Sequence, residues 1–126
     1  MGQIALVVDD SMLIRHTVCR FLEQRGFYVA SATNGLEALQ LLDEVLPDLI
    51  VTDLMMPKMT GGELITAVKA NPVTSRIPVV VLAGRSSARD MKPEGRADYV
   101  IFKDIDIEEQ LLKALTLTVG QATAAS

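Results

Sequence analysis

Five short apolar runs alternate with longer segments of helical periodicity along this chain, and this alternation limits the folds that it can adopt. The run Val79-Val80-Val81-Leu82 shows their character best, because it is continuously apolar and rich in β-branched residues. Such runs are typical of parallel strands that are buried on both faces. The pattern therefore predicts an α/β fold in which helices cover both sides of a parallel sheet. The expected strands span residues 3–8, 27–32, 48–52, 78–83 and 99–102.

Apolar spacing and capping residues predict helices after the first and third strands. Ser11 is a good N-cap for a helix over about 12–25, and Gly26 can end that helix. Thr60 is the expected N-cap of a helix over about 61–70. Apolar residues recur at helical spacing in both segments, so one face of each helix should pack against the sheet.

The remaining helices are less uniform. Asn34-Gly35 opens a helix that should end before Pro47, and the last helix is expected over about 106–119. The residues of the former that we expect to face inward are Leu36, Leu39 and Leu42. Residues 85–95 have little apolar periodicity and contain Pro93, so a fourth helix there should be degenerate: short, irregular or mobile.

With 126 residues, of which 49% are apolar, the chain has enough material for one hydrophobic core and little room for two. We expect one domain over residues 1–119, and then a segment of small residues, 120–126, that forms a flexible tail or the start of a linker. The formal net charge of −4 and the lack of a basic cluster argue against direct binding to nucleic acid.

Cys19 is the only cysteine, which excludes an internal disulfide and a zinc site with several thiolates. We interpret it as a small core residue, and His16, the only histidine, as a surface or interfacial residue. A chain without disulfides suits the reducing cytoplasm. No apolar run approaches the roughly 18 to 20 residues of a membrane span, so we expect a soluble, unexported protein without a membrane segment.

Aspartates follow two of the expected strands: Asp9 and Asp10 come after the first strand, and Asp53 comes after the third. Ligands of open parallel sheets gather outside the carboxyl ends of the strands. If these two strands are neighbours, the carboxylates share one crevice, where each pair at about 4 Å repels by about 4 kcal/mol at an effective dielectric near 20. Such a cluster needs a cation, and a hard ion such as Mg²⁺ suits oxygen ligands. The pattern is therefore typical of metal-assisted phosphoryl transfer.

Three segments carry a family resemblance through their order and spacing. They are Val8-Asp9-Asp10-Ser11, the loop Asp53-Leu54-Met55-Met56-Pro57-Lys58-Met59-Thr60-Gly61, and Lys103 directly after the fifth strand. Together they resemble a response-regulator receiver domain of two-component signalling, over nearly the whole chain. The resemblance implies a flavodoxin-like, doubly wound three-layer sandwich with five parallel strands in the order 2-1-3-4-5.

The resemblance also implies a role for each site residue. Asp53 would be the nucleophile that accepts a phosphoryl group, and Lys103 would contact that group. Asp10 and Asp53 would bind Mg²⁺ together with the backbone carbonyl of Met55, and Asp9 would act mainly through water. The positive charges of Mg²⁺ and Lys103 suit phosphoryl transfer, which needs alignment and charge neutralisation.

The implied function is that of a signalling module and not of a metabolic enzyme, because such a domain catalyses only its own phosphorylation and dephosphorylation. The phosphoryl donor would be a sensor histidine kinase or a phosphotransfer protein in the cytoplasm. The downstream partner, either a separate protein or an output domain, stays open.

Several positions near the fourth and fifth strands depart from the family pattern. Ala83 stands where receivers usually carry a Thr or Ser that contacts the phosphoryl group, and Val100 stands where they carry the switch aromatic. Tyr99 lies one position earlier, so it should face the opposite side of the sheet. Asp104 replaces the usual proline, and we therefore expect a trans peptide bond after Lys103 and a reshaped loop.

These departures lead to the hypothesis that Asp53 is phosphorylated while the signal is read out in a non-standard way. Arg85, two residues after Ala83, is a candidate for a further phosphoryl contact, since guanidinium groups suit phosphate. A solvated loop arginine is the simpler interpretation of the same residue.

Three alternatives remain. The first is an interaction module that keeps the acidic pocket but works without phosphorylation. An aspartate-nucleophile phosphatase is less favoured, because Met55 stands two residues after Asp53, where such an enzyme has its second acid. A flavin-binding flavodoxin relative is the least favoured, because the loop Asp9-Asp10-Ser11 would repel a phosphate without a bridging cation.

Overall fold

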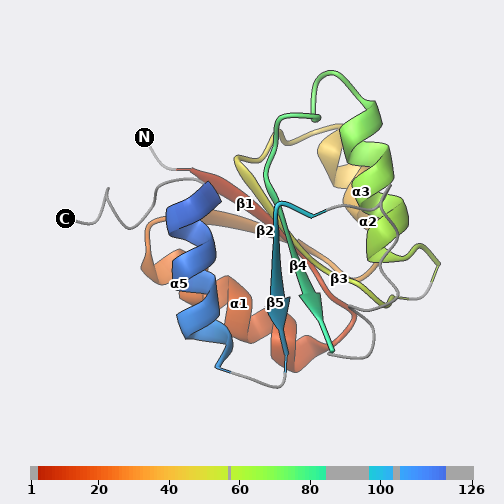
Figure 1. The fold of residues 1–126 in the computed structure, drawn as a ribbon. Helices are drawn as coiled ribbons and strands as arrows, with labels where there is room; N and C mark the ends of the chain where they lie inside the picture. Colours follow the sequence, from red (N-terminus) through yellow and green to blue (C-terminus); the bar gives the residue numbers. More distant parts are fainter. Residues whose placement is uncertain (1–2, 57, 85–96, 104–105, 119–126) are drawn as a thin grey trace.

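The computed structural model describes residues 3–56, 58–84, 97–103 and 106–118. Five strands form one parallel sheet in the order β2-β1-β3-β4-β5, and Figure 1 shows this sheet between two layers of helices. The expected α/β sandwich and its strand order are therefore confirmed. The strands are β1 (Ile4–Val8), β2 (Tyr28–Ala32), β3 (Leu49–Asp53), β4 (Val79–Ala83) and β5 (Tyr99–Phe102).

The strands begin and end within one residue of the bounds expected from the apolar runs. β3 and β4 are buried along their whole length, which is the pattern of central strands with helices on both faces. β2 lies at an edge of the sheet and is partly exposed. The apolar runs thus located the central strands because most of their buried positions are apolar, with Thr52 and Asp53 at the end of β3 as buried polar residues.

Two apolar clusters fill the space between the sheet and its helices. The described helices are α1 (Met12–Gln24), α2 (Gly35–Leu42), α3 (Gly61–Ala70) and α5 (Ile107–Thr118). α1 and α5 contribute Phe21, Leu22 and Leu111 to the cluster on one face, and α3 contributes Leu64 and Ile65 to the cluster on the other face. Each such side chain stabilises the fold by about 1.5 to 3 kcal/mol on burial.

Capping side chains fix where the helices begin. Ser11 Oγ accepts a hydrogen bond from the Ile14 N–H at 3.3 Å at the start of α1. Thr60 and Glu63 form a capping box at the start of α3, and Asn34 caps α2. The caps of α1 and α3 lie in the loops that leave β1 and β3, so they also hold the shape of these loops.

The inward face of α2 is narrower than expected. Leu36 is 46% exposed, so the prediction that it faces inward is wrong. Gly35 and Ala38 are the buried residues of α2, and Leu36, two positions before Ala38, points to the side of the helix opposite to it. Leu39 and Leu42 are partly buried against the same cluster as Ala38, and the helix ends at Leu42, five residues before Pro47.

Two residues with reactive side chains lie on α1. Cys19, which we interpreted as a small core residue, is half-buried and packs against the edge of the core cluster. Burial raises the pKa of its thiol, and the negative charge of Glu23 adds to this effect. His16 is exposed, as expected.

Some expectations concern segments outside the described residues. They include the degenerate fourth helix, Arg85, the peptide bond before Asp104 and the tail over 120–126. Within the described parts of the chain, every helix is too short or too polar to cross a membrane.

Candidate functional site

The acidic residues meet at the carboxyl ends of β1 and β3. Parallel pairing places Val8 beside Thr52, so Asp9 and Asp53 follow neighbouring positions. Carboxylate oxygens of Asp9, Asp10 and Asp53 all lie within 4.8 Å of one another. Asp9 and Asp53 are buried, whereas Asp10 is exposed. The crevice lies where the strand order reverses, which is the usual ligand position in open α/β sheets.

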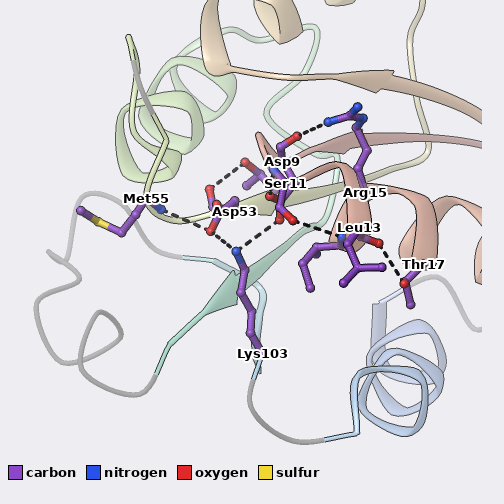
Figure 2. A network of polar contacts seen from close by, with 10 residues as sticks. Asp9, Ser11, Leu13, Arg15, Thr17, Asp53, Met55 and Lys103 are labelled. Carbon is purple, nitrogen blue, oxygen red and sulfur yellow. Dashed lines mark hydrogen bonds and ion pairs between the residues drawn. The ribbon is translucent and has the colours of Figure 1, made fainter.

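Lys103 reaches the same crevice from the end of β5. Figure 2 shows its ammonium group between two carboxylates, with Nζ 2.9 Å from Asp53 Oδ1 and 3.3 Å from Asp9 Oδ2. Its backbone N–H donates to the Ala83 carbonyl at 3.0 Å, which extends the pairing of β4 and β5 by one residue. Strand pairing thus fixes the base of this side chain, and ion pairs fix its tip.

Asp53 is the last residue of β3 and opens a tight loop. The Met55 N–H donates a long hydrogen bond to Asp53 Oδ1, at 3.4 Å, and the Gly61 N–H donates to the Leu54 carbonyl at 2.8 Å. A Cβ on Gly61 would collide with the carbonyl oxygen of Asp53, so a glycine is required for α3 to begin this close to the strand. Lys58, within the loop, has a left-handed backbone with φ of 70°.

One buried carboxylate oxygen of Asp9, Oδ2, has an ion pair but no hydrogen bond among the described residues. Its Oδ1 accepts from the Ser11 N–H at 2.8 Å, and its backbone carbonyl accepts from Arg15 Nη1 at 2.8 Å (Figure 2). Within the described part of the chain, Oδ2 accepts no hydrogen bond, and the Lys103 ammonium at 3.3 Å makes an ion pair with it without the geometry of a directed bond. An unsatisfied buried carboxylate oxygen can serve as a cation ligand.

The charges in the crevice shift the pKa values of its members. Burial raises the pKa of Asp53 and the charge of Asp9 raises it further, so that the opposing effects of Lys103 and the Met55 N–H are outweighed. Burial acts to lower the pKa of Lys103, but the hydrogen bond to Asp53 and the charges of Asp53 and Asp9 outweigh it and raise that pKa. Lys103 is therefore held in its charged form. Its positive charge does not fully offset the burial of Asp53 and the charge of Asp9, so the pKa of Asp53 stays raised.

The donor set fits a hard divalent cation. All three side chains offer carboxylate oxygens, which Mg²⁺ prefers over nitrogen or sulfur ligands. A divalent ion would also relieve the two electrostatic deficits of the site, namely the unsatisfied Oδ2 of Asp9 and the raised pKa of Asp53.

Ala83, Val100 and Tyr99, where the sequence was expected to depart from the pattern of the resemblance, lie on β4 and β5. Ala83 ends β4 next to Phe102 and is 1% exposed. Val100 packs against the cluster under α2 and α3, whereas Tyr99 packs against the cluster under α1 and α5. The expected opposite orientation of Tyr99 is confirmed, so its ring cannot take the place of an aromatic at position 100.

Met55 contributes its backbone to the site, while its side chain is 62% exposed and points away from the carboxylates in Figure 2. A ligand role for its carbonyl stays a prediction, and the candidate contact from Arg85 lies outside the described residues. Sequence reasoning missed Arg15, whose contact with Asp9 is part of the same polar network. The available signal was a long side chain in the first turns of α1, because helical side chains point back toward the N-terminus of their helix.

The fold and the crevice define the class of the protein: a flavodoxin-like α/β domain with a carboxylate cluster and a paired lysine at its switch point. The family model of the response regulator receiver domain matches residues 5–116. The chain belongs to this family.

The chain is similar to known proteins in both sequence and structure. The phosphate regulon transcriptional regulatory protein PhoB of Klebsiella pneumoniae is 40% identical over 90 residues, which cover 71% of this chain and 39% of PhoB. The chemotaxis response regulator CheY4 of Vibrio cholerae has a TM-score of 0.82 at 33% identity, with 92% of this chain and 98% of that chain covered. The receiver domain of the sensor histidine kinase PA1611 of Pseudomonas aeruginosa, with a magnesium ion in its active site cleft, has a TM-score of 0.85 at 20% identity, with 95% and 99% covered. This chain thus corresponds to less than half of PhoB.

Proposed function

We propose that this receiver domain accepts a phosphoryl group on Asp53 in an Mg²⁺-dependent reaction, with a sensor histidine kinase or a phosphotransfer protein of the cytoplasm as the donor. The observation that carries the proposal is the surroundings of Asp53, a buried carboxylate with Lys103 Nζ at 2.9 Å and two further carboxylates beside it. Membership of the receiver family supports the same reading.

The transfer replaces one bond to phosphorus by another. An oxygen of Asp53 forms the bond to phosphorus while the bond from phosphorus to the imidazole nitrogen of the donor breaks. The nitrogen keeps the bonding electron pair and takes up a proton, and Asp53 becomes an aspartyl phosphate. Dephosphorylation follows when water attacks the phosphorus and the Asp53 carboxylate leaves.

The residues of the crevice would bind Mg²⁺ and orient the phosphoryl group. Asp10, Asp53 and the Met55 carbonyl would hold Mg²⁺, with Asp9 acting through water. The bound ion supplies positive charge that neutralises the carboxylates and the phosphoryl oxygens. Lys103 already pairs with Asp53, so it can exchange a carboxylate oxygen for a phosphoryl oxygen and orient the transferred group.

Acetyl phosphate tests the acceptor directly. With Mg²⁺ present, mass spectrometry of the native chain should show a phosphoryl adduct that maps to Asp53. Chelation of Mg²⁺ should suppress the adduct, and Asp53→Asn should remove it while the variant stays folded by circular dichroism. The proposal fails if the native chain gives no adduct under conditions that modify a control receiver, or if the adduct maps to another residue.

The readout of phosphorylation should differ from that of the usual receiver switch. Ala83 has no hydroxyl to contact the phosphoryl group, and Val100 offers no aromatic ring at the switch position. Ala83→Thr would supply the hydroxyl, and we expect it to accelerate the reaction with acetyl phosphate. An unchanged rate would show that the missing hydroxyl does not limit this chain.

The same two residues favour a second candidate function, an interaction module that works without phosphorylation. Amide chemical shifts distinguish the two. Under the phosphorylation proposal, a phosphoryl mimic such as beryllofluoride should shift resonances beyond the crevice, into β4 and β5. Shifts confined to the loops that carry Asp9, Asp53 and Lys103 would favour the second candidate.

A further inference from the structure

Hydrogen bonds from described residues hold Asp9 at every polar atom except Oδ2. Its backbone N–H donates to the Ala32 carbonyl at 3.1 Å, which ties the end of β1 to β2. Its Oδ1 accepts from the Ser11 N–H at 2.8 Å, and its carbonyl accepts from Arg15 Nη1 at 2.8 Å. Only the last of these bonds comes from a side chain, and Figure 2 shows Arg15 reaching back from α1 to make it.

The bond from Arg15 acts on Asp10 as well as on Asp9. The carbonyl of Asp9 and the N–H of Asp10 belong to one rigid peptide plane. A donor that fixes this carbonyl therefore fixes the direction in which the chain enters Asp10. Asp10 is exposed, so the backbone contributes much of what determines where its carboxylate lies.

This constraint matters because the three carboxylates repel one another. Carboxylate oxygens within 4.8 Å of one another repel by about 3 kcal/mol per pair at an effective dielectric near 20. Asp9 and Asp53 are buried and cannot move apart, whereas exposed Asp10 can relieve the repulsion by turning outward. A peptide plane held by Arg15 limits that movement before any cation arrives.

We infer that Arg15 is a positioning residue for the divalent cation: through the Asp9 carbonyl it keeps Asp10 beside Asp9 and Asp53 as part of a preformed oxygen site. The inference rests on the proposed function for the identity of the ion. Outer partners that orient metal ligands in this way typically contribute about 10-fold to 100-fold in metal affinity.

The direction in which Mg²⁺ affinity changes when Arg15 is removed shows whether Arg15 acts by positioning Asp10 or only through its charge. Arg15 carries a positive charge close to the cation site, so its removal should tighten Mg²⁺ binding if charge alone mattered. If Arg15 positions Asp10, its removal should weaken Mg²⁺ binding. Arg20 is the matched control, because it is an exposed arginine on the same helix, roughly 7.5 Å further along the axis.

Isothermal titration with Mg²⁺ alone, on the full chain, tests this. Arg15→Met should weaken Mg²⁺ affinity about 10-fold. Arg15→Lys, which keeps a donor on a long side chain, should recover most of the loss, and Arg20→Met should leave the affinity unchanged or slightly tighter. At saturating Mg²⁺, the rate of Asp53 phosphorylation by acetyl phosphate should return to the native value in Arg15→Met. Circular dichroism melts verify that each variant is folded.

The contrary outcomes are distinct. Mg²⁺ binding by folded Arg15→Met that is as tight as native binding, or tighter, would overturn the inference. Arg15→Lys or Arg20→Met that weakens Mg²⁺ binding as much as Arg15→Met does would overturn it as well. A native chain that binds no Mg²⁺ would overturn it together with the proposed function. A native chain that binds Mg²⁺ with the expected variant pattern, but forms no adduct on Asp53, would overturn the proposed function alone.

Discussion

Aspartates lie at both ends of the sheet, in different surroundings. At the amino ends, Asp48 and Asp98 each precede a strand and accept a hydrogen bond from the first N–H of the neighbouring strand, from Ile4 at 2.8 Å and from Val79 at 2.7 Å. The N–H groups of both aspartates return a bond to the carbonyls of the same residues, at 2.7 and 2.8 Å. At the carboxyl ends, buried Asp9 keeps Oδ2 without a hydrogen bond from any described residue.

A lysine pairs with aspartate at each end, with Asp98 at the amino end and with Asp9 and Asp53 at the carboxyl end. Lys69 Nζ lies 3.2 Å from Asp98 Oδ2 and also donates to the Ile77 carbonyl at 3.0 Å, so it joins α3 to the starts of β4 and β5. Lys103 lies between the carboxylates of Asp9 and Asp53. The amino end combines partners that satisfy one another. The carboxyl end concentrates charges that still need a partner, which is typical of functional sites.

The largest effect should come from removing the lysine of the carboxyl end. Without Mg²⁺, Lys103→Met should lower the free energy of unfolding by about 3 kcal/mol at most, because two buried carboxylates lose their cation. Saturating Mg²⁺ should restore part of this loss, since it supplies positive charge. Urea unfolding with and without Mg²⁺ measures both values. Lys113→Met, at an exposed position on α5, is the control and should change neither.

The next largest loss of stability should come from removing Asp98 at the amino end of the sheet. Asp98→Ala should lower the free energy of unfolding by about 2 kcal/mol, because the Val79 N–H loses its acceptor and Lys69 loses its partner. Asp98→Asn keeps an acceptor oxygen and should lose less. Urea unfolding should give the same loss with and without Mg²⁺. Recovery of Asp98→Ala by Mg²⁺ would contradict the separation of the two ends.

Asp53→Asn should act in the opposite direction and stabilise the Mg²⁺-free protein by roughly 1 kcal/mol at neutral pH. The pKa of Asp53 is raised, so the folded state binds this proton more tightly than the unfolded state does. The resulting stabilisation is complete below the unfolded pKa and is lost as pH rises through the raised folded pKa. The advantage of the variant should therefore shrink as pH falls. Urea midpoints across this range check the trend, and a growing advantage toward acid pH would contradict it.

The smallest change in stability should come from a substitution in the loop after Asp53. Lys58 has a φ of 70°, a region that glycine adopts without a steric cost. Lys58→Gly should raise the thermal midpoint, with a gain of about 0.5 kcal/mol after the added chain entropy of glycine is subtracted. Lys58→Ala keeps the strained backbone and should show no such gain. Equal midpoints for both variants would show that the charge of Lys58, and not its backbone, matters.

The fold was readable from the sequence because its determinants are local. Apolar runs such as Val79-Val80-Val81-Leu82 located the strands, and Ser11 and Thr60 located two helix starts. The strand order followed from the family resemblance, since periodicity does not specify which strands are neighbours. The error at Leu36 arose because three leucines at helical spacing were all assigned to one face, whereas the helix packs through the smaller Ala38.

The site was readable only in part. Asp9 follows β1 and Asp53 ends β3. The rule that ligands gather at the carboxyl ends of parallel strands predicts their shared crevice once the resemblance makes these two strands neighbours. The contacts of Arg15 and Asp98 were missed, because each depends on how a side chain meets a backbone group that local patterns do not identify. The roles of Asp10, Met55 and Lys103 came from the resemblance and await the experiments above.

A crystal structure with Mg²⁺ and beryllofluoride tests the central claim most directly. The account predicts beryllofluoride on a carboxylate oxygen of Asp53, Lys103 Nζ on a fluoride, and Mg²⁺ held by Asp10, Asp53 and the Met55 carbonyl. The amino-end pair of Lys69 and Asp98 should keep its contacts. Asp53 free of the mimic at saturating concentration, or Mg²⁺ bound away from the three aspartates, would contradict the account.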